Sequence, residues 1–329
     1  MPRVALVARQ AGSEAALAPW AEALGEGASL LPRGVELGEA EATLAALAPE
    51  VLVTGTSERA ADDARYWAWA RARGVRSIAF VDHWVNLGAR FSPSGSGRVE
   101  VEPDVIAVID ERAARALVEE GATPARVRVI GSPALDVAAE VRAARAPRAD
   151  TRRVLLASEP WPGDDEALRR EHGFTDLDCL SAALDALSAW AEAAGARVDA
   201  VVRPHPRDTD ARLAPLLTAR PRVTVAVEGG DKRAALARAE LVVGARTTLL
   251  LEALGAGCQV VSAQLARTRG SALTDDRPGL AVATDADELA RALASALSST
   301  SAPPLPASLL GLDRAVALTR EQARAASPR

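Results

Sequence analysis

Residues 241–262, LVVGARTTLLLEALGAGCQVVS, decide the fold because they contain a complete strand–helix–strand unit. The apolar runs 241–243 and 260–262 predict two strands, and residues 247–254 predict the helix between them. Both strands are apolar throughout, which is typical of a parallel sheet covered by helices on both faces. The stretch therefore predicts a parallel α/β fold.

The same alternation of strand and helix extends in both directions along the chain of 329 residues. It indicates βαβ units, and a chain of this length has room for roughly two domains of ~150 residues. We therefore predict two Rossmann-like domains whose parallel sheets face each other across a cleft. The predicted strands are residues 4–8, 29–31, 51–54, 77–81, 105–109, 127–130, 154–157, 198–202, 223–227, 241–243, 260–262 and 280–283.

A break in composition at residues 146–153 separates the two predicted domains. We expect an N-terminal acceptor domain at 1–147 and a C-terminal nucleotide-sugar-binding domain at 152–300. Residues 301–329 are expected to form a linker and a helix that packs back on the N-terminal domain. The stretch 86–103 shows no periodicity, and we expect a mobile loop there.

Charge and cysteine content exclude several classes of protein. The chain has 39 basic and 44 acidic residues and a net charge of −5, which disfavours a nucleic-acid-binding protein. Cys179 and Cys258 are too few for a disulfide framework or a zinc site and fit a reducing cytoplasm. The longest apolar stretch is interrupted by Arg246 and Glu252, so no transmembrane segment is expected, and peripheral contact with a membrane stays open.

The absence of several sequence motifs narrows the chemistry further. Lys232 is the only lysine, so a Walker A phosphate loop is excluded and only one residue is a candidate for Schiff-base formation. The chain has no Gly-x-Ser-x-Gly motif and no Gly-x-Gly-x-x-Gly motif after the first strand. Serine hydrolases and NAD dehydrogenases therefore lose their main support. We expect no metal site and no bound cofactor.

The first candidate site follows the strand at 198–202. Arg203 and Arg207 flank His205, which lies between two prolines that restrict the backbone. An imidazole held in this way, next to guanidinium groups, suits a phosphate or diphosphate ligand. The alternative is a turn whose histidine satisfies a backbone carbonyl.

The second candidate site follows the strand at 241–243. Gly244 would let the backbone approach a ligand, Arg246 would add positive charge, and Thr247 and Thr248 would open a helix whose free N–H groups favour an anion. Glu252 interrupts an otherwise apolar helix one turn further on, within reach of a ribose diol. The alternative is a threonine cap with an exposed glutamate.

The third candidate site follows the strand at 77–81. We expect Asp82 to act as a general base, with His83 either orienting it or serving as the base itself. Trp84 would stack on a sugar face. The alternative for His83 and Trp84 is a structural role in a buried turn. The predicted acceptor-side residues are Trp84, Asn86, Gly55 and Thr56.

Residues 203–206 and 244–262 resemble bacterial glycosyltransferases of the two-domain GT-B class, which carry a Gly…Ser/Thr-Ser/Thr…Glu-Ala…Gly pattern. His205-Pro206 is similar to an element of sialyltransferase-like and capsule-assembly enzymes and of polyol-phosphate transferases. The resemblance implies that His205 and Thr247/Thr248 contact the phosphate of the donor and that Glu252 lies near its ribose. The acidic base motif of many sialyltransferases is not evident.

The resemblance implies a metal-independent glycosyltransferase that moves a sugar from a CMP- or UDP-activated donor to a carbohydrate or glycoconjugate acceptor in surface polysaccharide assembly. The sugar-nucleotide 2-epimerases share the architecture and form the main alternative, with a UDP-sugar hydrolase beside them. Their usual Gly-Thr-Arg-Pro-Glu-like loop and His-Arg…Glu-Asn stretch are replaced here by residues 8–12 and 205–208. A non-catalytic nucleotide-sugar-binding protein is a further alternative.

Overall fold

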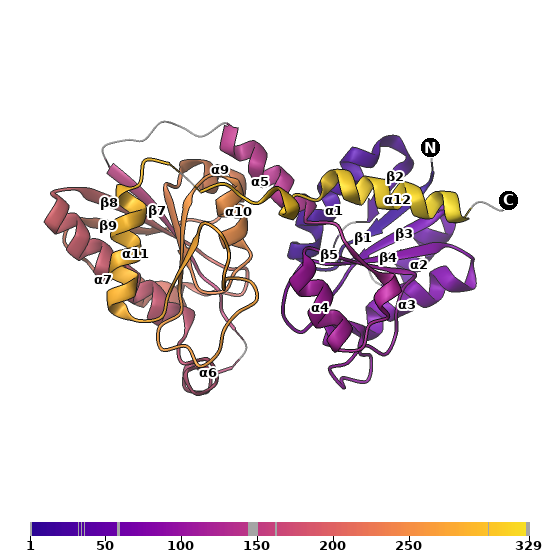
Figure 1. The fold of residues 1–329 in the computed structure, drawn as a ribbon, viewed down its shortest axis with the longest axis horizontal. Coiled ribbons are helices and arrows are strands. Elements are labelled where there is room, and N and C mark those ends of the chain that lie inside the picture. Colours follow the sequence, from indigo (N-terminus) through magenta and orange to yellow (C-terminus); the bar gives the residue numbers. More distant parts are fainter. Residues whose placement is uncertain are drawn as a thin grey trace. The chain divides into compact units, whose positions relative to one another are not determined.

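The computed structural model describes residues 2–31, 33, 35, 37–57, 60–143, 151–161, 163–301 and 303–326. The chain divides into two compact units, Met1–Val137 with Pro306–Arg329, and Ala138–Leu305. Each unit contains a six-stranded sheet whose described strand pairs are all parallel (Figure 1). The predicted fold class, two Rossmann-like α/β domains, is confirmed. The boundary expected between residues 147 and 152 falls largely on 144–150, which lie outside the described residues.

The sheet of the first unit has the strand order β2-β1-β3-β4-β5-β6. From β1 the chain first forms β2 on one side of β1 and then β3 on the other side. The strand order therefore reverses between β1 and β3. Ligands of open α/β sheets bind outside the carboxyl ends of the strands at such a reversal. The strands are β1 (Val4–Val7), β2 (Ala28–Leu31), β3 (Val51–Gly55), β4 (Arg76–Val81), β5 (Val105–Val108) and β6 (Val127–Val129).

Helices cover the strands of this sheet, and every residue of β1 and β3 is buried. This burial is the physical reason that the strand sequences are apolar throughout rather than alternating. The helices that follow β1 to β6 in turn are α1 (Ala11–Leu24), α2 (Leu37–Leu47), α3 (Ala60–Ala72), the 3-10 helix at Gly88–Phe91, α4 (Glu111–Glu119) and α5 (Pro133–Ala143).

The C-terminal helix α12 (Leu312–Ala326) belongs to the first unit, where it packs on α1 and against β3 and β4 (yellow in Figure 1). The indole nitrogen of Trp20 donates a buried hydrogen bond of 3.0 Å to the Thr319 hydroxyl. The chain enters α12 next to Gly131, whose φ of 79° and close approach to the Leu310 carbonyl leave no room for a side chain.

The sheet of the second unit has the order β12-β11-β10-β7-β8-β9, and its strand order reverses between β7 and β10. The short helices α8 (Asp210–Leu213), α9 (Lys232–Arg238) and α10 (Leu249–Gly255) follow β8, β9 and β10. The strands are β7 (Thr151–Ala157), β8 (Arg197–Arg203), β9 (Val223–Val227), β10 (Leu241–Gly244), β11 (Gln259–Ala263) and β12 (Leu280–Ala283).

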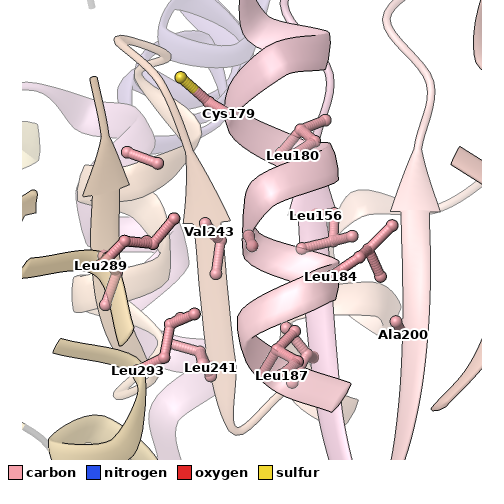
Figure 2. Close-up of a cluster of buried hydrophobic side chains, with 14 of the residues drawn as sticks. Leu156, Cys179, Leu180, Leu184, Leu187, Ala200, Leu241, Val243, Leu289 and Leu293 are labelled. Carbon is pink, nitrogen blue, oxygen red and sulfur yellow. The ribbon is translucent and has the colours of Figure 1, made fainter. Parts of the chain in front are cut away.

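The core of the second unit lies between this sheet and two helices, α7 (Asp176–Ala194) and α11 (Ala286–Ser298). Figure 2 shows Leu180, Leu184 and Leu187 on one stripe of α7, pointing toward residues of the strands and α11. All three are fully buried, and burying such a side chain contributes about 1.5–3 kcal/mol. The repeat of leucine along α7 therefore fixes which face of the helix meets the sheet.

Two segments differ from the sequence-based expectation. Residues 165–172 form a helix that the sequence pattern does not predict, α6 (Asp165–His172), which Asp164 caps and the left-handed Gly173 ends. The sequence pattern also predicts a helix at residues 211–219, where the structure has a single turn of α8 followed by a 3-10 helix at Ala214–Leu217. Pro215 is the physical reason, because it has no N–H to continue the α-helical pattern.

The stretch 86–103, expected to be a mobile loop, contains no strand but is anchored to the first unit. The Phe91 ring is buried and stacks on Trp67 at a centroid distance of 5.3 Å. The carboxylate of Glu100 accepts hydrogen bonds from the hydroxyls of Ser92, Ser94 and Ser96. These bonds lower the pKa of Glu100 to about 2.

Candidate functional site

The loop after β8 holds His205 through two backbone contacts. Its N–H donates to Asp208 Oδ2 at 2.7 Å, and its ring nitrogen Nδ1 accepts the Arg207 N–H at 3.1 Å. Burial, followed by the charge of Arg207, lowers the pKa of His205 below 6.5. The neutral ring therefore keeps Nδ1 as an acceptor and offers Nε2–H as a donor, which suits an anionic ligand.

Arg203 occupies the last position of β8, and the two terminal nitrogens of its guanidinium differ in their contacts. Its Nη2 donates to the Gly230 carbonyl at 2.8 Å. Its Nη1 is buried and has no hydrogen-bond partner among the residues that the structure describes. A buried donor without a partner is unusual in folded proteins, so this atom is a candidate contact for a ligand.

A buried ion-pair network fixes the loop of His205. Arg212 pairs with Asp208 at 2.6 Å and with Asp176 at the start of α7, and it also donates to the Ser158 hydroxyl at 3.1 Å. The side chains of both aspartates are only 1% exposed. The network joins the ends of β7 and β8 to α7. Aspartate near a helix start commonly caps the helix, so the sequence does not indicate this network.

The residues after β10 lead into α10, whose N-cap residue is Thr248. A Cβ on Gly244 would lie 3.0 Å from Thr247 and 3.2 Å from Ala157, so Gly244 serves close packing. The Thr247 hydroxyl accepts the Leu249 N–H at 3.3 Å, whereas the Thr248 side chain makes no cap bond at the start of α10.

The guanidinium of Arg246 makes hydrogen bonds to other residues of the second unit. It donates to the Gln264 side chain at 3.0 Å and to the Arg269 carbonyl at 3.1 Å. It also lies 5.8 Å from the Trp161 ring centroid and 5.1 Å from that of Phe174. These contacts orient the Arg246 side chain. The backbone N–H of Arg246 lies at the strand reversal and makes a separate contact.

That backbone N–H donates to Glu159 Oε2 at 2.8 Å. Glu159 follows β7, so this hydrogen bond spans the reversal between β7 and β10. Burial raises the pKa of Glu159 to about 7. Sequence reasoning missed Glu159. Its position two residues after a buried strand was the available signal.

Glu252 makes an ion pair inside the unit. Its Oε2 lies 2.6 Å from Nζ of Lys232, the first residue of α9, and its side chain is 12% exposed. The glutamate is therefore not a solvated helix charge. Its place near a ribose stays a prediction.

In the first unit, Asp82 lies at the end of β4 under the first turn of α1. A Cβ on Gly12 would lie 2.5 Å from Asp82 Oδ2, so a side chain at this position would require the Asp82 carboxyl group to move. Arg90 Nη1 lies 3.4 Å from Asp82 Oδ1 and donates to the Thr56 carbonyl and hydroxyl at 3.2 Å. Burial raises the pKa of Asp82, and the charge of Arg90 opposes the rise.

His83 is neutral at pH 7. Burial, followed by the charge of Arg90, lowers the pKa of His83 to about 4, and its Nδ1 accepts the Val85 N–H at 3.3 Å. Between the two candidate bases, Asp82 is thus the one whose pKa is moved toward neutrality. A raised pKa makes a carboxylate a stronger base, so Asp82 is the better candidate to take a proton.

Three of the four predicted acceptor-side residues are buried. Trp84 is 5% exposed and donates through Nε1 to Asp110 Oδ2 at 2.8 Å, so its ring face does not offer the expected stacking surface. The Thr56 hydroxyl lies between the Phe80 carbonyl and Arg90. Gly55 is in close contact with Ser13 at the start of α1. Asn86 alone of the four is exposed, with a left-handed φ of 54°.

A second carboxyl group of raised pKa lies at the strand reversal of the first unit. Asp63 is buried in α3 and accepts the N–H and hydroxyl of Ser57 at 2.7 and 2.8 Å. Burial raises the pKa of Asp63 to about 6. Arg9, after β1, pairs with Asp62 at 2.9 Å. Sequence reasoning missed this cluster.

Within the described residues, no group of three or more histidine, cysteine, aspartate or glutamate side chains is arranged to hold a metal ion. A search of the same residues finds no helix with the length and apolar character needed to span a membrane.

Comparison with known proteins identifies relatives of the fold. No protein-family model and no curated protein matches the chain. Among solved structures, the UDP-GlcNAc 2-epimerase of Methanocaldococcus jannaschii aligns with a TM-score of 0.65 and 15% identity over 97% of this chain and 99% of its own. That of Neisseria meningitidis, bound to UDP-GlcNAc, aligns at 0.61 and 10% over 98% and 100%.

HepE of Anabaena, in complex with UDP and glucose, aligns with a TM-score of 0.55 and 13% identity over 99% of this chain and 97% of its own. At these identities the comparisons show the fold, and they show it over nearly the whole chain. The architecture is that of the UDP-GlcNAc 2-epimerases. The sialyltransferase-like type has no support among these structures.

Proposed function

We propose that the protein is an enzyme that binds a UDP-sugar through the carboxyl edge of the sheet in its second unit. The observation that carries the proposal is a pair of donors at the carboxyl end of β8. One is the buried Nη1 of Arg203, which has no partner within the described part of the chain, and the other is the Nε2–H of a neutral His205. Both suit diphosphate oxygens. Structures of the same fold, named with UDP or UDP-GlcNAc, support the nucleotide.

The reaction that we propose first is 2-epimerisation of the UDP-sugar, because full-length fold neighbours are named UDP-GlcNAc 2-epimerases. Epimerisation at carbon requires a group that takes a proton and returns it. Asp82 fits this role, since it is a carboxyl group of raised pKa at the carboxyl edge of the first sheet.

Glycosyl transfer is the second candidate, favoured by a specific observation in the sequence. The loops in which the epimerases usually carry Gly-Thr-Arg-Pro-Glu-like and His-Arg…Glu-Asn motifs hold other residues here, at 8–12 and 205–208. In this reaction Asp82 would take the proton of an acceptor hydroxyl, and Arg203 and Arg207 would offset charge on the departing phosphate.

Two measurements test the proposal in order. A thermal-shift panel of CMP, CDP, UDP, GDP and their sugars should show stabilisation by UDP compounds that His205→Ala abolishes, because ligand binding raises the melting temperature. The exposed Glu166, in α6, provides the control Glu166→Gln, which should keep the shift. A panel without any shift would contradict nucleotide-sugar binding.

Incubation of the protein with UDP-GlcNAc alone, followed by NMR, then separates the reactions. Appearance of the 2-epimer supports the epimerase, and stoichiometric release of free sugar indicates hydrolysis. A donor that stays unchanged until a carbohydrate acceptor is added supports the transferase.

A further inference from the structure

Glu159 lies where the architecture predicts a ligand. It follows β7, the strand that β10 and β8 flank, and the strand order reverses between β7 and β10. Its carboxylate accepts the Arg246 N–H at 2.8 Å and so bridges the two sides of the reversal. The adjacent Pro160 carbonyl accepts a hydrogen bond of 2.8 Å from Arg207 in the loop of His205. The Glu159 loop thus contacts both loops that were predicted to hold the phosphate.

The charged groups that act on Glu159 come from two elements packed against it. Arg246, in the loop after β10, provides the N–H and a guanidinium. Asp176, at the start of α7, accepts the Glu159 N–H at 2.8 Å and repels its carboxylate, although Arg212 partly neutralises Asp176. The indole of Trp161 donates a hydrogen bond to the carboxylate. Burial outweighs these contacts and places the titration of Glu159 near pH 7.

We propose that Glu159 is a ligand-binding residue of the nucleotide-sugar site, and that a diphosphate bound beside the Arg246 N–H requires Glu159 as the neutral acid. This inference rests on the proposed function. An ionised carboxylate only accepts hydrogen bonds, so it competes with a phosphate oxygen for the Arg246 N–H and repels its charge. The neutral acid can donate its O–H to that oxygen. At pH values above the pKa of Glu159, ligand binding is therefore accompanied by the uptake of one proton.

The test measures the dissociation constant of UDP-GlcNAc by calorimetry at pH 6, 7, 8 and 9. Its diphosphate diester does not titrate in this range, and burial lowers the pKa of His205 below 6.5. In the unaltered protein the dissociation constant should rise about tenfold per pH unit above pH 7. Glu159→Gln should make the affinity independent of pH and, at pH 9, about 100-fold tighter than that of the unaltered protein. Glu166→Gln, the exposed control in α6, should keep the pH dependence.

Proton uptake provides a second measurement that needs no variant. At pH 8 the binding enthalpy should change with the ionisation enthalpy of the buffer in a way that corresponds to about one proton per ligand. Equal pH dependence in Glu159→Gln and the unaltered protein, or binding without proton uptake, would overturn the inference and leave the proposed function standing. Failure of every variant to bind UDP-GlcNAc at any pH would contradict the proposed function and the inference with it.

Discussion

The Nζ atom of Lys232 lies 2.6 Å from Oε2 of Glu252, so the only lysine of the chain pairs with the only acidic residue of α10. The two residues belong to the helices that precede and follow β10. Sequence reasoning considered Lys232 for Schiff-base chemistry and Glu252 for a ribose. The ion pair gives Lys232 a different role, because its ammonium group holds the Glu252 carboxylate in place, and the ribose role of Glu252 stays a prediction.

Replacing Glu252 should therefore weaken nucleotide binding. We expect Glu252→Ala to lower the affinity for UDP about 10- to 100-fold, since a hydrogen bond to a charged group contributes about 1.5–3 kcal/mol. Lys232→Met should have a smaller effect, because it removes only the group that orients Glu252. Titration calorimetry measures both. Arg238→Met is the control, because Arg238 lies on the same helix as Lys232 and makes only an exposed pair with Glu228, and equal affinities of Glu252→Ala and Arg238→Met would refute the ribose role.

Replacing Asp82 should affect turnover rather than nucleotide affinity. Asp82→Asn keeps the shape of the side chain but cannot accept a proton, so we expect turnover of UDP-GlcNAc to fall by about 10²–10⁴. Binding of UDP should be unchanged, because the proposed nucleotide contacts belong to the second unit. Steady-state kinetics and calorimetry give the two values. Glu41→Gln, at an exposed pair with Arg65, provides the control, and identical turnover in the two variants would remove Asp82 from the chemistry.

The buried pair between Asp176 and Arg212 should contribute to stability only as an intact pair. We expect Arg212→Met to lower the free energy of unfolding by about 3–5 kcal/mol, because it leaves a buried carboxylate without a counter-charge. Adding Asp176→Asn should recover part of the loss. Arg170→Met, at an exposed i,i+4 pair, should cost less than about 0.5 kcal/mol. Urea denaturation followed by circular dichroism measures the free energy of unfolding of each variant. Equal stabilities of Arg212→Met and Arg170→Met would contradict the prediction.

The positions of all twelve strands could be predicted from the sequence, because a sheet covered on both faces leaves a short apolar run at each strand. The helix α7 could also be predicted from the sequence, since its leucines repeat along one stripe. The helix α6 was missed because Leu168 is its one buried residue and no apolar periodicity is present. Its ends depend on the Asp164 cap and on Gly173, signals that are weak without a periodic segment between them.

The candidate site could be predicted only at the level of loops. Residues after β4, β8 and β10 were selected because the carboxyl ends of parallel strands share one edge of a sheet. The partners of those residues could not be predicted: Glu159 meets the Arg246 N–H across 87 positions of sequence, and no local pattern encodes such a pairing. Burial of Trp84 was likewise undecided, because an aromatic residue after a strand suits a core as well as a sugar face.

Glu159 should also control how stability depends on pH. Its pKa is about 7 in the folded protein against 4.5 for the unperturbed group, so between these values the folded state binds more protons than the unfolded state. Stability therefore falls as pH rises from about 4.5 to 7, by at most about 3 kcal/mol at 1.36 kcal/mol per pKa unit. Glu159→Gln should remove this loss and be more stable than the unaltered protein at pH 8.

The comparison must be made between variants, because His83 acts in the opposite direction. Its pKa of about 4 in the folded protein lies below the usual 6.5, so its contribution to stability is lost as pH falls through that interval. Urea denaturation at pH 5, 6, 7 and 8 isolates Glu159, since the His83 contribution is common to both proteins and cancels in their difference. We expect the advantage of Glu159→Gln to grow from pH 5 to 7 and to level off toward pH 8, and a constant difference from pH 5 to 8 would show that Glu159 titrates at its ordinary value.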